Sequence, residues 1–334
     1  MANDASPTRS HALVKNLERA GVSNAVILTE QPKKLAERFP GFFDRILVDA
    51  PCSGEGMFRR DLDAVKAYTT NKPDACVTLQ NQILHHAATM LKPGGRMVYS
   101  TCTFNPIENE RVIATFLASH SDFDLLPIDH TALGISHGRP EWANRENKLA
   151  YTARIWPHLA PGEGHFIALL LKKGDSFTNY SLKTKAGRRP KEYKLFELFC
   201  KEYLNSISFN GNFVTHGVSL YLQPDDIDLK GLRVARSGLR LGEVLHKRFE
   251  PSQALAMLLG NSANTNIAKY IVELPEDLAW RYLKGESLDL PANFDIPEGK
   301  QKHWVLITHL GLSLGWAKLV QGRLKNHLPV GWVV

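Results

Sequence analysis

Cysteine and long apolar runs are both scarce in this sequence, and each shortage excludes a class of protein. Four cysteines among 334 residues are too few for a disulfide-stapled scaffold, and none belongs to a C-x-x-C pair or lies near paired histidines, so we expect no zinc or other metal site. A membrane-spanning helix needs roughly 18 consecutive apolar residues, whereas the longest mainly apolar stretch, HFIALLL at 165–171, has the length of a strand. The N-terminus lacks the apolar core of a secretory signal, which indicates a cytoplasmic protein that does not bind membranes.

Acidic residues are outnumbered by basic ones. The chain has 41 Lys and Arg against 34 Asp and Glu, which gives a net charge of +7 and an isoelectric point of about 9.1. A basic balance suits a polyanionic partner, usually a nucleic acid, although many basic enzymes bind none. The hydrophobic share of 43% and the charged share of 22% are typical of globular proteins, and the length allows two or three domains.

Strand and helix patterns alternate between residues 1 and 173. Ser6 can cap a first helix, which Gly21 ends. Further along, the strand-like stretches are 23–30, 42–50, 96–101 and 164–173, and the helical stretches are 77–91 and 106–120. This alternation predicts an α/β domain with a mostly parallel, doubly wound sheet.

The composition changes after this first region. From residue 172 to residue 194 there are eight basic residues against two acidic ones, which indicates a basic linker at 174–193. An amphipathic helix at 194–204 begins a second domain, which extends to residue 262. The remainder, 263–334, is rich in strand patterns and is expected to form a small β-barrel.

Two segments of the first region carry candidate chemistry, ILVDAPCSGEGMFRRD at 46–61 and YSTCTFNPIENE at 99–110. Each places a cysteine, Cys52 or Cys102, just beyond the carboxyl end of an expected strand. Ligands of open α/β sheets bind at that edge. If the strands are neighbours, both thiols face one crevice.

A thiolate in such a crevice is a good nucleophile at neutral pH, and it can add to an electron-poor ring carbon such as C6 of a pyrimidine. Gly54 and Gly56 allow the backbone to approach a ligand closely. A disulfide pair of a redox protein is the competing interpretation for the two thiols. Cys76 and Cys200 are interpreted as small core residues.

The same two segments resemble the fourth and sixth motifs of the RNA cytosine-5 methyltransferases of the nucleolar-protein/Sun family. The line at 153–173 resembles that family's closing catalytic strand, and 231–257 resembles the first C-terminal domain of its bacterial RsmF-like branch. The end of the chain resembles that branch's PUA-like RNA-binding domain. The resemblance implies a Rossmann-like methyltransferase sheet at 1–173, followed after the linker by two small C-terminal domains, 194–262 and the PUA-like 263–334.

The resemblance also implies roles for individual residues and a cofactor, S-adenosylmethionine. Cys102 matches the nucleophile that adds to C6 of the target cytosine, and Cys52 matches the cysteine that assists proton removal and product release. Asp49 matches the acidic residue at the edge of the cofactor, which is close enough to touch the target base as well and so counts among the catalytic residues. Asp4 matches the residue that binds the cofactor's ribose, and its alternative role is that of an acidic residue at a helix N-terminus. Glu30, with Gln31 as the alternative, matches an acidic residue on the adenine side of the cofactor.

The implied substrate is RNA, and ribosomal RNA in particular. Candidate RNA contacts are the basic residues Arg59, Arg188, Arg189, Lys318, Arg323 and Lys325. The last three have a competing interpretation as the solvated surface of a small barrel.

In the family a first strand and a glycine-rich loop precede the element that matches A-N-D, whereas this sequence starts at Met1 within it. We therefore expect weak cofactor binding by the chain as written. The alternative function is that of a catalytically impaired fragment that only binds RNA.

Overall fold

The computed structural model describes residues 1–60, 62–70, 73–131, 134–143, 146–175, 187, 189–205, 207–224, 227–260, 267–291 and 302–334. Contacts between residues divide the chain into two compact units, Met1–Glu30 together with Tyr180–Val334, and Gln31–Asn179. Each unit has its own hydrophobic core. Within the described ranges, no helix is long and apolar enough to cross a membrane.

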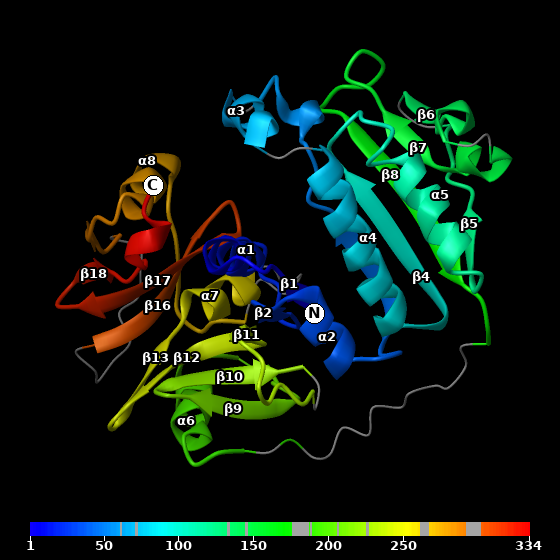
Figure 1. Cartoon of the computed structure of the whole chain (residues 1–334). Helices are drawn as coiled ribbons and strands as arrows, with labels where there is room; N and C mark the ends of the chain where they lie inside the picture. The colour runs from blue at the N-terminus through cyan, green and yellow to red at the C-terminus, as the bar shows by residue number, and fades with distance from the viewer. Residues whose placement is uncertain are drawn as a thin grey trace. The chain divides into compact units, whose positions relative to one another are not determined.

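The unit Gln31–Asn179 is built on a mixed sheet with the strand order β3-β4-β8-β7-β6, in which β5 also pairs with β8 (Figure 1). Its strands are β3 (Phe43–Asp49), β4 (Leu91–Thr101), β5 (Phe123–Leu126), β6 (Ile135–His137), β7 (Ala153–Ile155) and β8 (His165–Lys172). Its helices and 3₁₀ turns are α2 (Pro32–Arg38), η1 (Glu55–Met57), α3 (Leu62–Thr70), α4 (Pro73–Met90), α5 (Glu110–Ser119), η2 (Pro140–Trp142) and η3 (Asn147–Tyr151). The strands and helices expected from 42 to 173 are therefore present.

The pairing is less parallel than the sequence predicted. β3 pairs with β4 in parallel, and β5 runs in the same direction, because α4 and α5 carry the chain back across the sheet. β8 is antiparallel to β4, β5 and β7, and β6 is antiparallel to β7. A loop joins β7 to β8 without a crossover helix, and such a connection returns the chain as an antiparallel neighbour.

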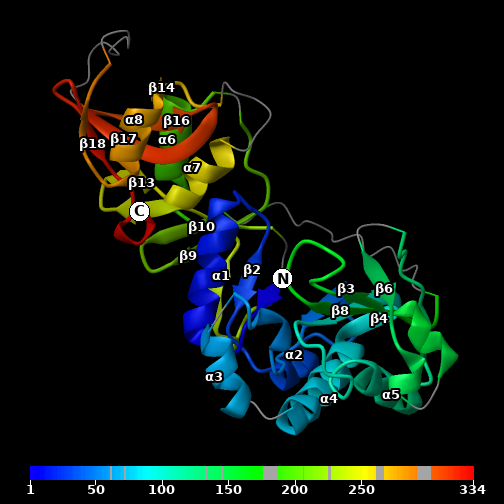
Figure 2. The ribbon, with the colours of Figure 1, turned by 90° about the horizontal axis from the view of Figure 1, so that it is seen from above.

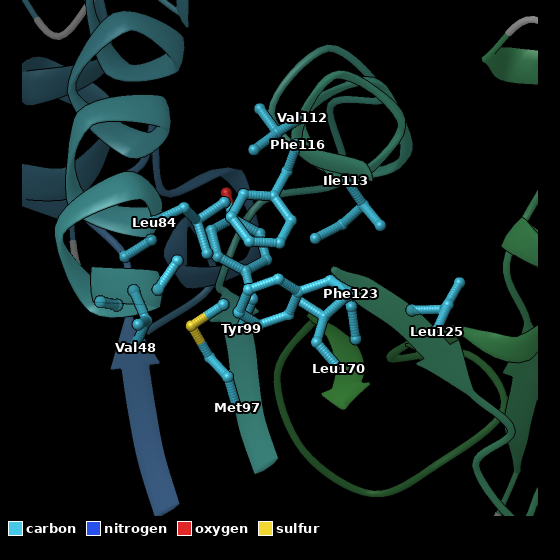
Figure 3. Packing of buried hydrophobic residues seen from close by; sticks show 14 of the residues in the cluster. Val48, Leu84, Met97, Tyr99, Val112, Ile113, Phe116, Phe123, Leu125 and Leu170 are labelled. Carbon is cyan, nitrogen blue, oxygen red and sulfur yellow. The ribbon is translucent and has the colours of Figure 1, made fainter. Parts of the chain in front are cut away.

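The core of this unit lies between one face of the sheet and the helices α4 and α5 (Figure 3). Leu84 of α4 and Phe116 of α5 pack against Met97, Tyr99 and Leu170, which point to that face from β4 and β8. Side chains alternate between the two faces of a strand, so the intervening residues point away from this core. One of these, Leu47 of β3, is 70% exposed. The packed face thus holds β3 and β4 in place, and the loops that follow these two strands carry the cysteines.

The first residues of the chain belong to the other compact unit, Met1–Glu30 with Tyr180–Val334. β1 (Ala2–Asn3) pairs in parallel with β2 (Val26–Leu28), and α1 (Pro7–Arg19) connects them. The other edge of β2 pairs with β11 (Val234–Ser237) of the C-terminal region. All three residues of β2 are buried, and buried backbone groups need hydrogen-bond partners, which β11 supplies. The domain boundaries drawn from the sequence stay a prediction.

Besides β1, β2 and β11, the unit Met1–Glu30 with Tyr180–Val334 contains two further sheets. Figure 2 shows them from above, with most of their strands labelled. The first has the order β13-β12-β10-β9 and the second β14-β16-β17-β18-β15. The strands are β9 (Asn212–His216), β10 (Ser219–Gln223), β12 (Leu239–Leu245), β13 (Arg248–Pro251), β14 (Ile271–Glu273), β15 (Leu288–Asp289), β16 (Lys302–His309), β17 (Leu312–Val320) and β18 (Arg323–Asn326). The helices are α6 (Tyr193–Tyr203), α7 (Gln253–Gly260) and α8 (Glu276–Leu283), with a final turn η4 (Val330–Trp332).

Aromatic side chains dominate one core of this unit. Phe196 and Phe199 of α6 pack against Phe249, and Trp316 of β17 joins the same cluster. The helix expected at 194–204 is therefore present, and its apolar face is buried as its period requires.

Candidate active site

The two cysteines singled out by the sequence meet at one edge of the β3–β4 pair. Asp49, the last residue of β3, pairs in register with Ser100 near the end of β4. The loops that follow bring Sγ of Cys52 to 3.3 Å from Sγ of Cys102, and both residues are half-buried. The spatial proximity expected from two parallel neighbouring strands is thus present.

The contact between the sulfur atoms shifts the pKa values of the two thiols in opposite directions. The hydrogen bond to Cys102, together with burial, raises the pKa of Cys52 above that of an ordinary thiol. Accepting the S–H of Cys52 lowers the pKa of Cys102, although burial and the nearby charge of Asp49 act in the opposite direction. Both directions favour the thiolate on Cys102 over the thiolate on Cys52. Cys102 is accordingly the better nucleophile of the two.

Glycines let three loops approach one another beside the thiols. Gly54 adopts a left-handed conformation with φ of 76°, which glycine tolerates best. The backbone N–H of Gly56 donates to the carbonyl of Cys102 at 2.8 Å. A Cβ on Gly56 would lie 2.6 Å from the carbonyl oxygen of Gly164 and 2.8 Å from that of Cys102. The glycine pattern therefore serves contact between loops as well as any approach of a ligand.

A buried ion pair supports the loop that carries Cys102. Arg154 of β7 donates to Glu110 of α5 and also to the carbonyl of Phe104 at 3.0 Å. The ring of Phe104 stacks on Trp156 with a centroid distance of 5.3 Å. The sequence did not predict this ion pair, nor the hydrogen bonds of Glu55 and Glu108 to the cysteine loops. The pattern that could have indicated the ion pair is ENE at 108–110, where two acidic residues follow the cysteine motif and begin an apolar helix.

Asp49, assigned to the cofactor's edge, is exposed at the end of β3. The other two expected cofactor residues lie in the other unit. The carboxylate of Asp4 accepts hydrogen bonds from the backbone N–H of Ser6 at 2.8 Å and from Arg9 at 3.1 Å. That arrangement matches the alternative role of an acidic residue at a helix N-terminus.

Glu30 is 2% exposed, and its carboxylate accepts the backbone N–H of Arg233 at 2.7 Å and the guanidinium of Arg233 at 3.3 Å. The carboxylate of Glu30 is thus already held by Arg233. The assignment of Asp4, Glu30 and Asp49 to the cofactor stays a prediction. Gln31, the alternative to Glu30, precedes α2 as its N-cap residue.

The basic residues expected to bind RNA are spread over both units. In the unit of the cysteines, Arg59 donates to the carbonyl of Gly162 at 3.5 Å. Arg188 lies outside the described residues. In the other unit, the guanidinium of Arg189 lies over the ring of Tyr193 at 4.7 Å.

Two of the C-terminal candidates are opposite each other across β17 and β18. Lys318 pairs in register with Lys325, and its ammonium lies 4.8 Å from the ring centre of Trp304. Burial lowers the pKa of Lys318, and the positive charge of Lys325 lowers it further. Arg323 forms an ion pair with Asp289 at 3.4 Å.

The remaining two cysteines differ in their surroundings. Cys200 packs against the aromatic core from α6, and burial raises its pKa to about 12. Cys76 is half-buried on α4, and its pKa is raised by burial and by the carboxylate of Glu108. No group of three or more metal-ligating side chains is found in the part of the chain that the structure describes.

Comparison with known proteins places the chain among methyltransferases. The family model of the 16S rRNA methyltransferases RsmB/F matches residues 1–171. The RsmF rRNA methyltransferase first C-terminal domain matches 198–259, and the methyltransferase RsmF PUA domain matches 269–334.

Curated relatives match this chain over nearly its whole length. The ribosomal RNA small subunit methyltransferase F of Shewanella loihica is 30% identical over 338 residues, which cover 98% of this chain and 66% of the relative. The protein of the same name from Aeromonas salmonicida is 31% identical and is covered to 67%. The chain thus spans about two thirds of the length of these relatives.

A solved structure described as a methyltransferase homolog protein from Pyrococcus horikoshii is 31% identical, with a TM-score of 0.41 over 51% of this chain and 52% of that one. A TM-score this low leaves the family assignment to the sequence matches. On those matches, this chain belongs to the 16S rRNA methyltransferase RsmB/F family and carries the two C-terminal domains of the RsmF type.

Proposed function

We propose that the chain methylates C5 of cytosine in RNA, with ribosomal RNA as the substrate and S-adenosylmethionine as the methyl donor. The observation that carries the proposal is the 3.3 Å contact between Cys52 and Cys102 at the edge of the β3–β4 pair. Family membership supports methyl transfer to ribosomal RNA. The thiol pair supports the choice of a pyrimidine carbon as the methyl acceptor.

Cys102 acts as the nucleophile in this scheme. Its thiolate is stabilised by the S–H of Cys52, and it adds to C6 of the cytosine so that a C–S bond forms. The electron pair of the C5–C6 double bond then makes C5 nucleophilic. S-adenosylmethionine, when bound, supplies an electrophilic methyl group for this carbon.

Cys52 completes the cycle as the proton acceptor. After methylation, C5 still carries its proton, and removal of that proton lets the C5–C6 double bond re-form and the C–S bond to Cys102 break. The elevated pKa of Cys52 keeps it protonated while Cys102 attacks. Cys52 then releases its proton to solvent water, and the resulting thiolate is the base that accepts the proton from C5. In this scheme Asp49, which is exposed at the same edge, accepts a hydrogen bond from the base.

The test measures transfer of a radiolabelled methyl group from S-adenosylmethionine to ribosomal RNA, together with electrophoresis under denaturing conditions. We expect Cys102→Ala to abolish incorporation and Cys52→Ala to accumulate a covalent protein–RNA adduct, seen as a slowly migrating band. Cys200→Ala, which alters a half-buried thiol of the aromatic core, is the matched control. Normal turnover without adduct in Cys52→Ala would refute the two-thiol scheme. Retained RNA affinity without any methyl incorporation in the unmodified chain would favour a protein that only binds RNA.

A further inference from the structure

Glu108, which lies beyond Cys102 in the sequence, binds the loop of the other cysteine. Its side chain is fully buried, and its carboxylate accepts the backbone N–H of Ser53 at 2.9 Å and the Ser53 hydroxyl. Gln80 of α4 donates to the same carboxylate at 3.1 Å and to the carbonyl of Pro51 at 2.9 Å. The residues on both sides of Cys52 are therefore held by Glu108, directly or through Gln80.

Glu55, which lies beyond Cys52, makes the converse contact. Its carboxylate accepts the backbone N–H of Phe104 at 3.1 Å and the hydroxyl of Thr103 at 3.1 Å. Thr103 directly follows Cys102 in the chain. The other oxygen of Glu55 accepts the hydroxyl of Tyr68 on α3 at 3.3 Å.

The two contacts are reciprocal. Each cysteine loop sends one carboxylate across to a backbone N–H that lies one or two residues after the other loop's cysteine. Between the carboxylates, the hydroxyl oxygens of Ser53 and Thr103 lie 2.9 Å apart. Each hydroxyl has one proton, so it donates either to its carboxylate or to the other hydroxyl at any one time. Glu108 is buried and Glu55 is half-buried, so both carboxylates need hydrogen bonds that replace lost hydration, and these donors provide them.

We propose that Glu55 and Glu108 are positioning residues, and that their reciprocal hydrogen bonds hold the sulfur atoms of Cys52 and Cys102 in contact. Neither carboxylate needs to touch a reacting atom for this role. The relevance of the contact to catalysis rests on the proposed function, but the positioning itself is a property of the free protein. Apolar residues of similar size would fill the space without fixing the two loops in register, because hydrogen bonds are directional and packing is not.

The contacts require acceptor oxygens more than they require charge. In Glu55→Gln, the amide oxygen can accept from Phe104 and Thr103 while the amide nitrogen donates to Tyr68. In Glu108→Gln, the oxygen can accept from Ser53 N–H and the nitrogen can donate to the Ser53 hydroxyl, which then donates to Thr103. Alanine at either position removes every one of these bonds. Glutamine is therefore expected to preserve the geometry and alanine to lose it.

The experiment measures how readily Cys52 and Cys102 form a disulfide, which depends on the distance between their sulfur atoms. The full chain is equilibrated with reduced and oxidised glutathione, quenched with an alkylating reagent and analysed by peptide mass spectrometry for the Cys52–Cys102 disulfide. In this exchange, one oxidised glutathione takes two electrons from the thiol pair and, with their two protons, becomes two reduced glutathione molecules. The equilibrium constant falls as the sulfur atoms separate, and it requires neither RNA nor cofactor.

We expect Glu55→Ala and Glu108→Ala to lower this equilibrium constant by about tenfold or more, and the two glutamine variants to stay within roughly threefold of the unmodified chain. Val112→Ala is the matched control, because it removes buried atoms from the core of the same unit without touching either loop. It should lower the unfolding midpoint while leaving the disulfide equilibrium unchanged.

If the alanine variants fail to fold, Thr103→Val supplies the same test with an isosteric change that removes the hydroxyl between the two carboxylates. An unchanged equilibrium in the alanine variants or in Thr103→Val would overturn the positioning role, and so would glutamine variants that lose the contact as completely as alanine. Because the measurement is independent of methyl transfer, a chain that shows the expected thiol equilibria but no methylation would retain the positioning role and refute the proposed function.

Discussion

Arg154 and Glu110 form a bidentate ion pair in which Nε lies 2.7 Å from Oε1 and Nη2 lies 2.6 Å from Oε2, and their side chains are 1% and 0% exposed. Such a pair has lost its hydration on both sides, so each partner depends on the other. The rings of Trp142 and Trp156 lie 4.8 and 5.2 Å from the guanidinium carbon and supply cation–π contacts. The pair joins α5 to β7 next to the loop of Cys102.

Removing one partner of this buried pair should lower the unfolding free energy more than removing an exposed charged side chain does. In Glu110→Ala the guanidinium of Arg154 stays buried without its carboxylate, and we expect a loss of about 3–5 kcal/mol from the unfolding free energy. Urea unfolding of the full chain, followed for the transition of this unit, measures it. Lys148→Ala, which removes half of an exposed ion pair with Asp124, should change the free energy by less than about 1 kcal/mol. Equal effects in the two variants would contradict burial as the cause.

The acidity of Cys102 depends on its neighbour. Donation from Cys52 lowers the pKa of Cys102, whereas burial, Asp49 and Glu108 raise it. In Cys52→Ala the donor is gone and the opposing causes remain, so the pKa of Cys102 should rise. At neutral pH a smaller fraction is then thiolate, and alkylation of Cys102 by iodoacetamide should slow, with its rate profile displaced to higher pH.

Peptide mass spectrometry assigns the alkylated site in that experiment, and Cys200→Ala is the control that should leave the profile of Cys102 in place. A profile displaced to lower pH in Cys52→Ala would show that the S–H of Cys52 does not stabilise the thiolate. It would also remove the reason for assigning the attack to Cys102 over Cys52.

A methyl group added at Gly56 should separate the loops. Its Cβ would lie 2.6 and 2.8 Å from two backbone oxygens, and neither can move as a flexible side chain would. We expect Gly56→Ala to lower the unfolding free energy by roughly 1–3 kcal/mol, as overpacking does, and to weaken the Cys52–Cys102 disulfide equilibrium. Gly331→Ala, where a Cβ meets nothing within 4 Å, is the control and should have little effect. An unaffected disulfide equilibrium in Gly56→Ala would mean that the loops adjust independently.

Local patterns in the sequence predicted what depends on local structure. The strands at 42–50 and 96–101 followed from their apolar runs, and the proximity of Cys52 to Cys102 followed from their positions after neighbouring strands. The pairing of β2 with β11 could not be predicted in this way, because it joins segments about 200 residues apart and depends on which strand edge is left to be paired.

The partners of the buried charged residues could not be predicted from the sequence either. Glu110 and Arg154 are 44 residues apart, and nothing in either segment shows that the other will neutralise it. A charged residue among buried positions indicates that some partner exists, but only the packing of α5 against β7 decides which one. The roles assigned to Asp4 and Glu30 came from the resemblance alone, and the structure gives both carboxylates other partners within their own unit.

The two lysines on β17 and β18 provide a test of RNA binding. Lys318 and Lys325 are opposite each other, and like charges in that arrangement repel. A phosphate placed near both would relieve the repulsion, so each lysine should contribute to the salt dependence of binding. We expect Lys325→Gln to weaken RNA binding at low salt and to reduce the slope of log affinity against log salt by about one, since one phosphate contact is lost.

Fluorescence anisotropy with a ribosomal RNA fragment at several salt concentrations measures that slope. Lys201→Gln is the matched control, because this exposed lysine of α6 pairs with Glu197 on its own helix. Removing the charge of Lys325 should also raise the pKa of Lys318, since that charge is one of the causes that lower it. Lys318 then holds its proton more tightly, so the free protein should gain a little stability while RNA affinity falls. A variant that keeps the full slope would place the phosphate contacts elsewhere and would leave Lys325 as a solvated surface residue.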